Sequence, residues 1–209
     1  MPKSLPETLF VIVRHGNTFA AGEAPRRIGA RTDLPLTADG MAQAHALGAH
    51  FAALGLRFSR VLVSPLARTR ATASAISEHL PDAPAPQSCD WLREIDHGPD
   101  EDRPEEAVLA RIGAEALAAW DERAEPPPGW TVDAAGRRDA WRALFATDAG
   151  PTLLVTSNGA ARFALLADPA LTGSGTGAPG RMKLPTGAYG VIRRAAGGAL
   201  ALVEWGRRP

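Results

Sequence analysis

The chain has little of what marks several protein classes. Cys89 is the only cysteine among 209 residues, which excludes an intrachain disulfide and a cysteine-rich zinc site. No run of apolar residues is long enough to cross a bilayer. The 23 basic and 23 acidic residues cancel, so no overall charge favours nucleic acid or an anionic membrane as a partner. No signal peptide is visible at the N-terminus, and a soluble cytoplasmic protein is expected.

The apolar pattern predicts one α/β domain. A chain of this length with 45% hydrophobic residues can bury a sizeable core. Apolar runs predict strands at 9–13, 60–63, 88–92 and 152–156, and a closing hairpin at 189–193 and 199–205. Helices are predicted from Thr37 to about 54, and at about 66–79, 104–122 and 159–167. This alternation predicts a three-layer α/β/α sandwich with a mostly parallel central sheet. Residues 1–209 then form a single domain with an insertion or cap region at about 98–150.

The most informative stretch is Arg14-His15-Gly16-Asn17-Thr18, which follows the first expected strand directly. In open α/β sheets, ligands bind at the carboxyl ends of strands. A histidine can attack phosphorus, an arginine can hold phosphate oxygens, and a glycine lets the backbone come close. The stretch therefore predicts a site for phosphate chemistry.

Further polar clusters follow two other expected strands. Ser64-Pro65-Leu66-Ala67-Arg68-Thr69 comes after 60–63, and Ser157-Asn158-Gly159 comes after 152–156. A third segment, Leu92-Arg93-Glu94-Ile95-Asp96-His97-Gly98, supplies carboxylates. Because parallel strands end at one edge of a sheet, we expect these clusters to join the first one. Arg70, two residues beyond Arg68, faces elsewhere and is expected at the surface.

Together with Gly29-Ala30-Arg31-Thr32-Asp33-Leu34-Pro35-Leu36-Thr37, these motifs resemble the histidine phosphatase superfamily in their order and spacing. That family includes cofactor-dependent phosphoglycerate mutases and many small phosphatases. The resemblance covers most of the first half of the chain and part of the strand at 152–156. It implies a phosphoglycerate mutase-like fold and a phosphohistidine at His15.

The resemblance also implies roles for individual residues. Arg14 and Arg68 would hold the phosphate oxygens beside the catalytic His15. Glu94 matches the family's acid by position, and Asp96 is the nearby alternative. Contacts to the substrate are expected from three further residues, Asn17, Asn158 and Gly159. No metal and no cofactor is implied.

The chain departs from the family pattern at Asn158. Family members place a second histidine before the glycine that follows this strand, yet no histidine occurs here after His97. An amide donates a hydrogen bond without charge, which costs on the order of 1–2 kcal/mol of transition-state stabilisation, roughly tenfold in rate. Alternatively, Asn158 only caps the helix that begins near Gly159. His97 and Arg162 are candidates to replace the missing charge.

The favoured function is a metal-independent phosphatase that hydrolyses a small phosphomonoester through His15. The alternatives are a phosphoglycerate-type mutase, and a phosphate-ligand binding protein whose turnover is impaired by Asn158. The expected partner is a small phosphorylated substrate, with neither nucleic acid nor a membrane. Asp100, Glu101 and Asp102 are expected as a solvated run near the mouth of the site. Substrate identity and oligomeric state, a homo-oligomer included, are left open.

Overall fold

The centre of the structure is a mostly parallel sheet. The computed structural model describes residues 7–172 and 182–209. Within these ranges a six-stranded sheet has the order β4-β3-β6-β1-β7-β8. The parallel strands are β1 (Thr8–Arg14), β3 (Arg60–Val63), β4 (Gln87–Ser88) and β6 (Thr152–Thr156). The antiparallel pair β7 (Tyr189–Arg194) and β8 (Leu200–Arg207) closes one edge, which confirms the predicted hairpin.

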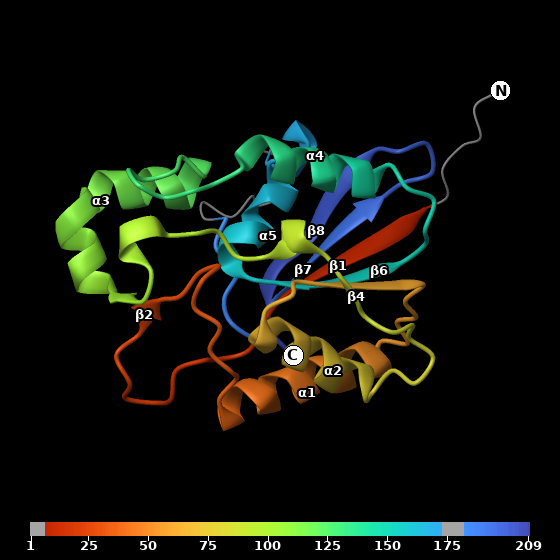
Figure 1. Cartoon of the computed structure of the whole chain (residues 1–209). Coiled ribbons are helices and arrows are strands. Elements are labelled where there is room, and N and C mark those ends of the chain that lie inside the picture. Colours follow the sequence, from red (N-terminus) through yellow and green to blue (C-terminus); the bar gives the residue numbers. More distant parts are fainter. Residues whose placement is uncertain (1–6, 173–181) are drawn as a thin grey trace.

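Helices cover both faces of this sheet, which confirms the predicted α/β/α sandwich. One face carries α1 (Ala38–Ala53) and α2 (Ala67–Ser77), and the other carries α4 (Ala134–Phe145) and α5 (Asn158–Leu165), as Figure 1 shows. The helix α3 (Glu105–Arg123) projects beyond the end of the sheet (Figure 1). Near it, the short strands β2 (Arg26–Arg27) and β5 (Arg103–Pro104) pair with each other.

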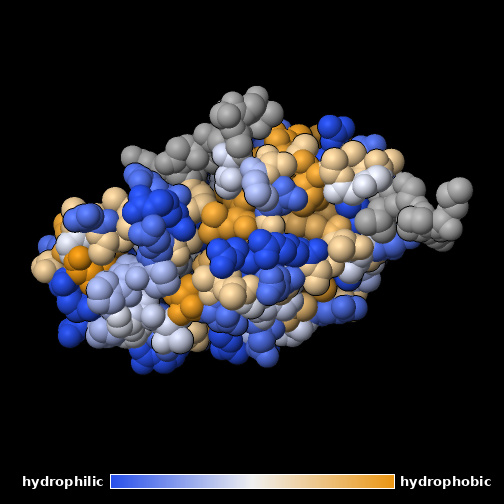
Figure 2. All heavy atoms as spheres, turned by 90° about the horizontal axis from the view of Figure 1, so that it is seen from above, coloured by the Kyte–Doolittle hydropathy of each residue, from blue (hydrophilic) through white to orange (hydrophobic). Residues whose placement is uncertain are grey.

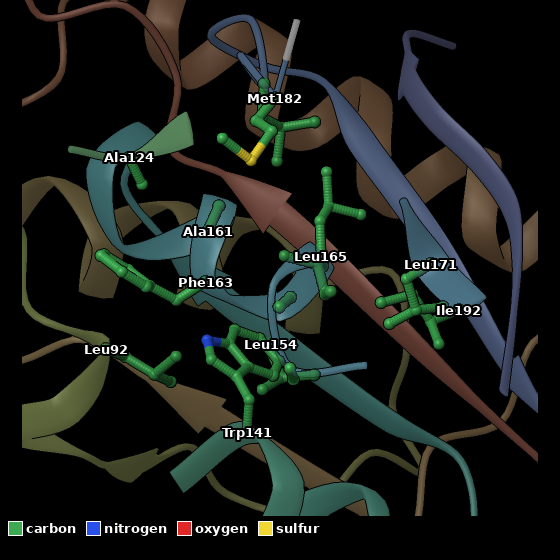
Figure 3. Close-up of a cluster of buried hydrophobic side chains, with 14 of the residues drawn as sticks. Leu92, Ala124, Trp141, Leu154, Ala161, Phe163, Leu165, Leu171, Met182 and Ile192 are labelled. Carbon is green, nitrogen blue, oxygen red and sulfur yellow. The ribbon is translucent and has the colours of Figure 1, made fainter. Parts of the chain in front are cut away.

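The central strands are apolar throughout because helices cover both of their faces. Side chains of a strand alternate between its faces, so β1 divides its apolar residues between two clusters. Phe10 and Ile12 pack in one cluster, whereas Val11 and Val13 pack in the other. Figure 3 shows part of the first cluster, in which Trp141 from α4 and Phe163 from α5 lie beside the strands. Truncating such a buried aromatic residue to alanine typically costs about 3–5 kcal/mol.

Two segments differ from the predicted elements. The strand predicted at 88–92 is wrong beyond Ser88, because β4 pairs only at Gln87 and Ser88 and Asp90–Leu92 then forms a 3₁₀ turn. The helix α4 was not predicted and packs on the sheet within the region 98–150. In the same region, α3 follows the prediction in its bounds but is broken at Gly113, whose φ is 81°.

The start of α1 is held against the loop that follows β1. Thr37 is the N-cap, as predicted, and its hydroxyl accepts a hydrogen bond from the Gly40 N–H at 3.1 Å. A Cβ at Gly16 would lie 2.2 Å from the Gly40 carbonyl oxygen, so only glycine allows this approach. The close contact places the residues after β1 between the sheet and the first turn of α1.

The outer surface is largely hydrophilic where Figure 2 shows it, with apolar patches between the polar side chains. Large hydrophobic side chains that are exposed in the described ranges, Leu54, Leu109 and Val203, lie on separate elements. None of the helices described here has the length and apolar character needed to span a bilayer.

Candidate active site

The predicted site residues meet at the carboxyl edge of the parallel strands. Arg14 ends β1 and lies opposite Thr156, the last residue of β6. The next residues, His15 on one strand and Ser157 on the other, are therefore neighbours, and the His15 N–H donates to the Thr156 carbonyl at 3.1 Å. Arg68 lies in the first turn of α2, which follows β3. This edge is where open α/β sheets bind ligands.

His15 is buried and its ring orientation is defined by two hydrogen bonds. The His15 Nδ1 lies 2.8 Å from the Gly16 carbonyl oxygen, and the His15 Nε2 lies 3.2 Å from Arg68 Nε. A carbonyl only accepts and a guanidinium only donates, so Nδ1 carries the proton and Nε2 carries the lone pair. The nitrogen that faces Arg68 is thus the nucleophilic one.

The environment of His15 keeps the imidazole neutral. Burial lowers its pKa well below the usual value, and the nearby charges of Arg68 and Arg14 lower the pKa further. The hydrogen bond to the Gly16 carbonyl raises the pKa but does not outweigh these effects. At neutral pH the Nε2 lone pair is therefore not consumed by protonation.

Arg68 is fully buried and is oriented by one loop. Its Nη1 donates to the Thr32 carbonyl at 2.7 Å and its Nη2 donates to the Gly29 carbonyl at 3.1 Å. Burial lowers the pKa of Arg68, although nearby carboxylates oppose the shift. The three bonds of this guanidinium fix the donor that points at His15.

Glu101 holds the loop that orients Arg68. One of its carboxylate oxygens accepts hydrogen bonds from the Gly29 N–H, the Arg31 N–H and the Thr32 hydroxyl at 3.0, 2.9 and 2.9 Å. The other oxygen accepts from the His97 N–H at 3.1 Å. Burial raises the pKa of Glu101, but interactions with the His97 side chain, the Thr32 hydroxyl and the backbone N–H groups of His97 and Arg31 outweigh burial and lower the pKa to about 2. The carboxylate is therefore ionised, and it holds the loop whose carbonyls orient Arg68.

The acidic run at 100–102 was expected to be solvated, and for two of its members this is wrong. Asp100 is only 2% exposed and accepts bonds from Arg111 and from the Trp130 indole. Glu101 has its side chain only 7% exposed. Asp102 alone is exposed, where it pairs with Arg26 at 3.0 Å. The run is drawn inward because its carboxylates satisfy loop N–H groups and an indole that tertiary contacts bring to them.

Of the two candidate acids, the buried one is Glu94. It is 6% exposed, and its two oxygens accept from the Gly159 N–H at 3.0 Å and the Ile95 N–H at 2.9 Å. Asp96 is instead engaged with Arg31 and with the Gly98 N–H, at 3.0 and 2.7 Å. The geometry therefore favours Glu94 over Asp96 as the carboxylate of the site.

The charge state of Glu94 is set by opposing effects. Burial raises its pKa, whereas the charge of His97, the two backbone N–H groups and the charge of Arg68 lower the pKa, and the net shift is downward. Gly159 permits the contact, because a Cβ there would lie 2.2 Å from a Glu94 oxygen. The Gly159 N–H, expected to contact substrate, is bonded to Glu94 in this structure.

Arg14 is held more loosely than Arg68. Its Nη1 donates to the Leu184 carbonyl at 2.9 Å, while its buried Nε has no hydrogen-bond partner among the described residues. Burial lowers the pKa of Arg14 to about 10, and the charge of Arg68 adds to the shift while that of Glu94 opposes it. Two neighbouring guanidinium groups whose pKa values are lowered in this way favour a bound anion.

Asn158 does not cap α5, so the capping explanation is wrong. The N-cap residue is Ser157, and Asn158 is the first residue of the helix. The Asn158 Oδ1 accepts from the Leu184 N–H at 2.9 Å, and its Nδ2 has no partner in the part of the chain that the structure describes. The buried Ser157 hydroxyl is also without a described partner. Ser157 was not predicted as a site residue, although its position directly after a buried strand was a signal for it.

The two candidates for the missing charge have partners of their own, but their charges still act on site residues, since Arg162 lowers the pKa of Arg14 and His97 lowers the pKa of Glu94. The Arg162 guanidinium is fully buried, donates to the Trp120 carbonyl and lies 4.1 Å from the centre of the Trp120 ring. Its Nη2 lies 3.5 Å from Asp121, so Arg162 holds the end of α3. The His97 ring packs on Trp130 and places Nδ1 3.6 Å from Glu101. These partners lie on the α3 and Glu101 side of the molecule.

Asn17 connects the loop after β1 to two other elements. Its N–H donates to the Gln43 side chain of α1 at 2.9 Å, and its Oδ1 lies 2.6 Å from the Thr186 hydroxyl, which precedes β7. Its carbonyl accepts from the Thr37 N–H at 3.0 Å. Asn17 thus ties the loop to α1 and to the segment before β7. Within the described ranges, no group of three His, Cys, Asp or Glu side chains is arranged to hold a metal ion.

Comparisons with known proteins show similarity to one family over most of the chain. The pattern of the histidine phosphatase superfamily (branch 1) matches residues 10–207. A 2,3-bisphosphoglycerate-dependent phosphoglycerate mutase from Methylobacterium sp. (strain 4-46) is 32% identical over 132 residues, which span 59% of this chain and 59% of the mutase.

Two solved structures share the fold. A mycobacterial glucosyl-3-phosphoglycerate phosphatase superposes with a TM-score of 0.73 at 22% identity, covering 96% of this chain and 99% of that one. A protein of Thermus thermophilus superposes with a TM-score of 0.64 at 28% identity, covering 93% of this chain and 98% of that one. The similarity therefore extends over nearly the whole length of each chain.

Proposed function

The chain belongs to the histidine phosphatase superfamily (branch 1), and we propose that it hydrolyses a small phosphomonoester through a phosphohistidine at His15. The observation that carries the proposal is the buried His15 ring, with its Nδ1 bonded to the Gly16 carbonyl and its Nε2 facing Arg68. A neutral imidazole whose free nitrogen faces a guanidinium is suited to attack a phosphoryl group that the guanidinium holds.

In the first step, His15 Nε2 attacks phosphorus and the bond from phosphorus to the leaving oxygen breaks. The phosphoryl oxygens replace His15 as acceptors of the Arg68 Nε–H and take further donors from Arg14. The leaving oxygen takes a proton from Glu94. Glu94 has a lowered pKa without ligand, but the negative charge of a bound phosphate raises the pKa and thus supplies the protonated carboxyl.

In the second step, water attacks phosphorus and the bond to His15 Nε2 breaks. Glu94, now ionised, takes the proton of the water, and inorganic phosphate leaves. The bond from Nδ1–H to the Gly16 carbonyl holds the ring in one orientation through both steps. The cycle ends with the neutral imidazole from which it began.

A phosphoglycerate-type mutase is the second candidate, and the similarity to the Methylobacterium mutase favours it. A mutase shares the first step but must keep water from the phosphohistidine and return the phosphoryl group to a bound acceptor. The two reactions therefore differ in the acceptor of the second transfer, which is water for the phosphatase and a bound hydroxyl group for the mutase.

The test is a panel of phosphomonoesters, including 3-phosphoglycerate, with colorimetric detection of released phosphate and mass-spectrometric detection of phosphohistidine. We expect phosphate release, label on His15, and loss of both in His15→Ala. His45→Ala is the matched control, because His45 lies on α1 with its side chain 40% exposed and contacts His79. Activity retained in His15→Ala contradicts the proposal. Phosphate binding without turnover on any ester indicates a binding protein.

A further inference from the structure

Leu184 bonds to both sides of the candidate site through its own backbone. Its carbonyl accepts from Arg14 Nη1 at 2.9 Å, and its N–H donates to Asn158 Oδ1 at 2.9 Å. Leu184 is fully buried in the cluster that Figure 3 shows in part, so packing holds its side chain in place. One buried residue therefore contacts a cation on one side and an amide on the other.

The direction of the Asn158 amide follows from this bond. The oxygen and nitrogen of an amide look alike in shape, but a backbone N–H can only donate. The end that faces Leu184 is thus Oδ1, and Nδ2 is the end left without a described partner. A histidine in this position offers charge, whereas the asparagine offers an acceptor for Leu184 and a donor on its opposite end.

The residues after Leu184 strengthen the same connection. The Gly187 N–H donates to the His15 carbonyl at 3.1 Å, and the Arg14 N–H donates to the Ala188 carbonyl at 3.0 Å. The backbone of Arg14 and His15 is therefore held by the segment 184–188, but the Arg14 guanidinium meets that segment through the Leu184 carbonyl. Arg68 is held by the separate loop that contains Gly29 and Thr32.

We infer that Asn158 is a positioning residue for Arg14, acting through the backbone of Leu184, in addition to offering its Nδ2 to the phosphoryl group. This inference rests on the proposed phosphate site and deepens it. Without the Asn158 acceptor, the Leu184 N–H loses its partner, and the peptide group that joins residues 183 and 184 can rotate. This rotation changes the backbone torsions at Leu184 and so moves the carbonyl that orients Arg14. Arg68 does not depend on Leu184, so its position stays unchanged.

The test is a pair of double-mutant cycles read by calorimetric binding of orthovanadate, a phosphate-like anion. One cycle combines Asn158→Ala with Arg14→Ala, and the control cycle combines Asn158→Ala with Arg68→Ala. We expect Asn158→Ala alone to weaken binding about tenfold. In the Arg14→Ala background the added loss falls to about threefold or less, whereas in the Arg68→Ala background it stays about tenfold.

Amide hydrogen exchange supplies a readout that does not depend on phosphate binding. The Leu184 N–H is expected to exchange faster in Asn158→Ala and to stay protected in Asn158→Asp, because a carboxylate still accepts the bond. Equal coupling of Asn158 to Arg14 and to Arg68, or unchanged exchange at Leu184, overturns the inference. If neither Arg14→Ala nor Arg68→Ala weakens vanadate binding, the proposed site itself fails instead.

Discussion

The two sides of the candidate site carry different kinds of groups. The side built on β1 and α2 presents full charges, from Arg14 and Arg68 around the neutral His15. The side built on β6 and α5 presents dipoles, from the Asn158 amide and the start of the helix. In the proposed phosphate site the positive charge is therefore concentrated on one side, and the neutral amide on the other side costs on the order of 1–2 kcal/mol relative to a charged donor.

The two sides also differ in how their residues are held. On the charged side, the buried carboxylate of Glu101 fixes the loop whose carbonyls orient Arg68. On the neutral side, the Gly159 N–H orients the Glu94 carboxylate, and the Leu184 backbone contacts Asn158. Each donor of the site is thus placed by a group that lies outside it.

The largest effect is expected from Arg68. We expect Arg68→Ala to lower kcat/KM by about 10²–10³, because the charge on the developing phosphoryl group loses its buried donor. Arg68→Lys should recover little of this loss, since a single ammonium nitrogen cannot reach the Thr32 carbonyl, the Gly29 carbonyl and the phosphate, which Arg68 reaches from three separate nitrogens. Steady-state kinetics on one ester, with Arg70→Ala as the exposed control, measures this. A loss of kcat/KM below tenfold for Arg68→Ala contradicts the role of Arg68 as the buried donor to the phosphoryl group.

The second-largest effect on the rate is expected from Glu94. The choice of leaving group separates its role as general acid in the first step from its role as general base in the second step. Glu94→Gln should lower kcat by about 10²-fold or more for an alkyl phosphate, whose leaving oxygen needs a proton. For p-nitrophenyl phosphate, whose phenolate leaves unprotonated, the loss in the first step should be small. Burst kinetics on both esters tests this, with Asp96→Asn as the control. If Asp96→Asn lowers kcat on the alkyl phosphate more than Glu94→Gln does, Asp96 is the acid.

Glu101 should affect stability in a pH-dependent way. Its pKa in the folded protein is about 2, below the usual 4.5, so the carboxylate stabilises the fold above about pH 4.5 and this contribution is lost as the pH falls toward 2. We expect Glu101→Gln to lose about 1–3 kcal/mol of unfolding free energy at pH 7, and less at pH 3. Urea unfolding at both pH values measures this. A loss that stays constant with pH excludes an ionised carboxylate.

Asn158 should give the smallest effect and the only gain. We expect Asn158→His to raise kcat/KM by up to about tenfold below the pKa of the new imidazole, because a charge is restored opposite Arg68. The gain is limited because the imidazolium cannot accept the Leu184 N–H as the Asn158 oxygen does. A pH–rate profile compared with wild type tests this. A gain that is independent of pH argues against the charge as its cause.

Much of the fold could be predicted because its signals are local. The strands at 9–13, 60–63 and 152–156 are continuously apolar, and the structure places them side by side in the sheet. The strand at 88–92 and the helix α4 were misread, because β4 is defined by two residue pairs and α4 by packing on the sheet. The periodicity of a segment does not report such contacts.

The candidate site at the strand ends was predicted from the polar motifs that follow the strands, and the family resemblance added His15, Arg68 and Glu94 as its proposed reactive groups. The hydrogen-bond partners of those groups could not be predicted in the same way, because they lie far away along the chain. Glu101 lies 72 residues from the Gly29 N–H that it binds, and Leu184 lies 26 residues from Asn158. A carboxylate in an acidic run resembles a solvated one until folding buries it beside unpaired N–H groups. Residue type and spacing therefore predicted a phosphate site at the strand ends, whereas long-range hydrogen bonding decided how Glu101 and Asn158 are held beside it.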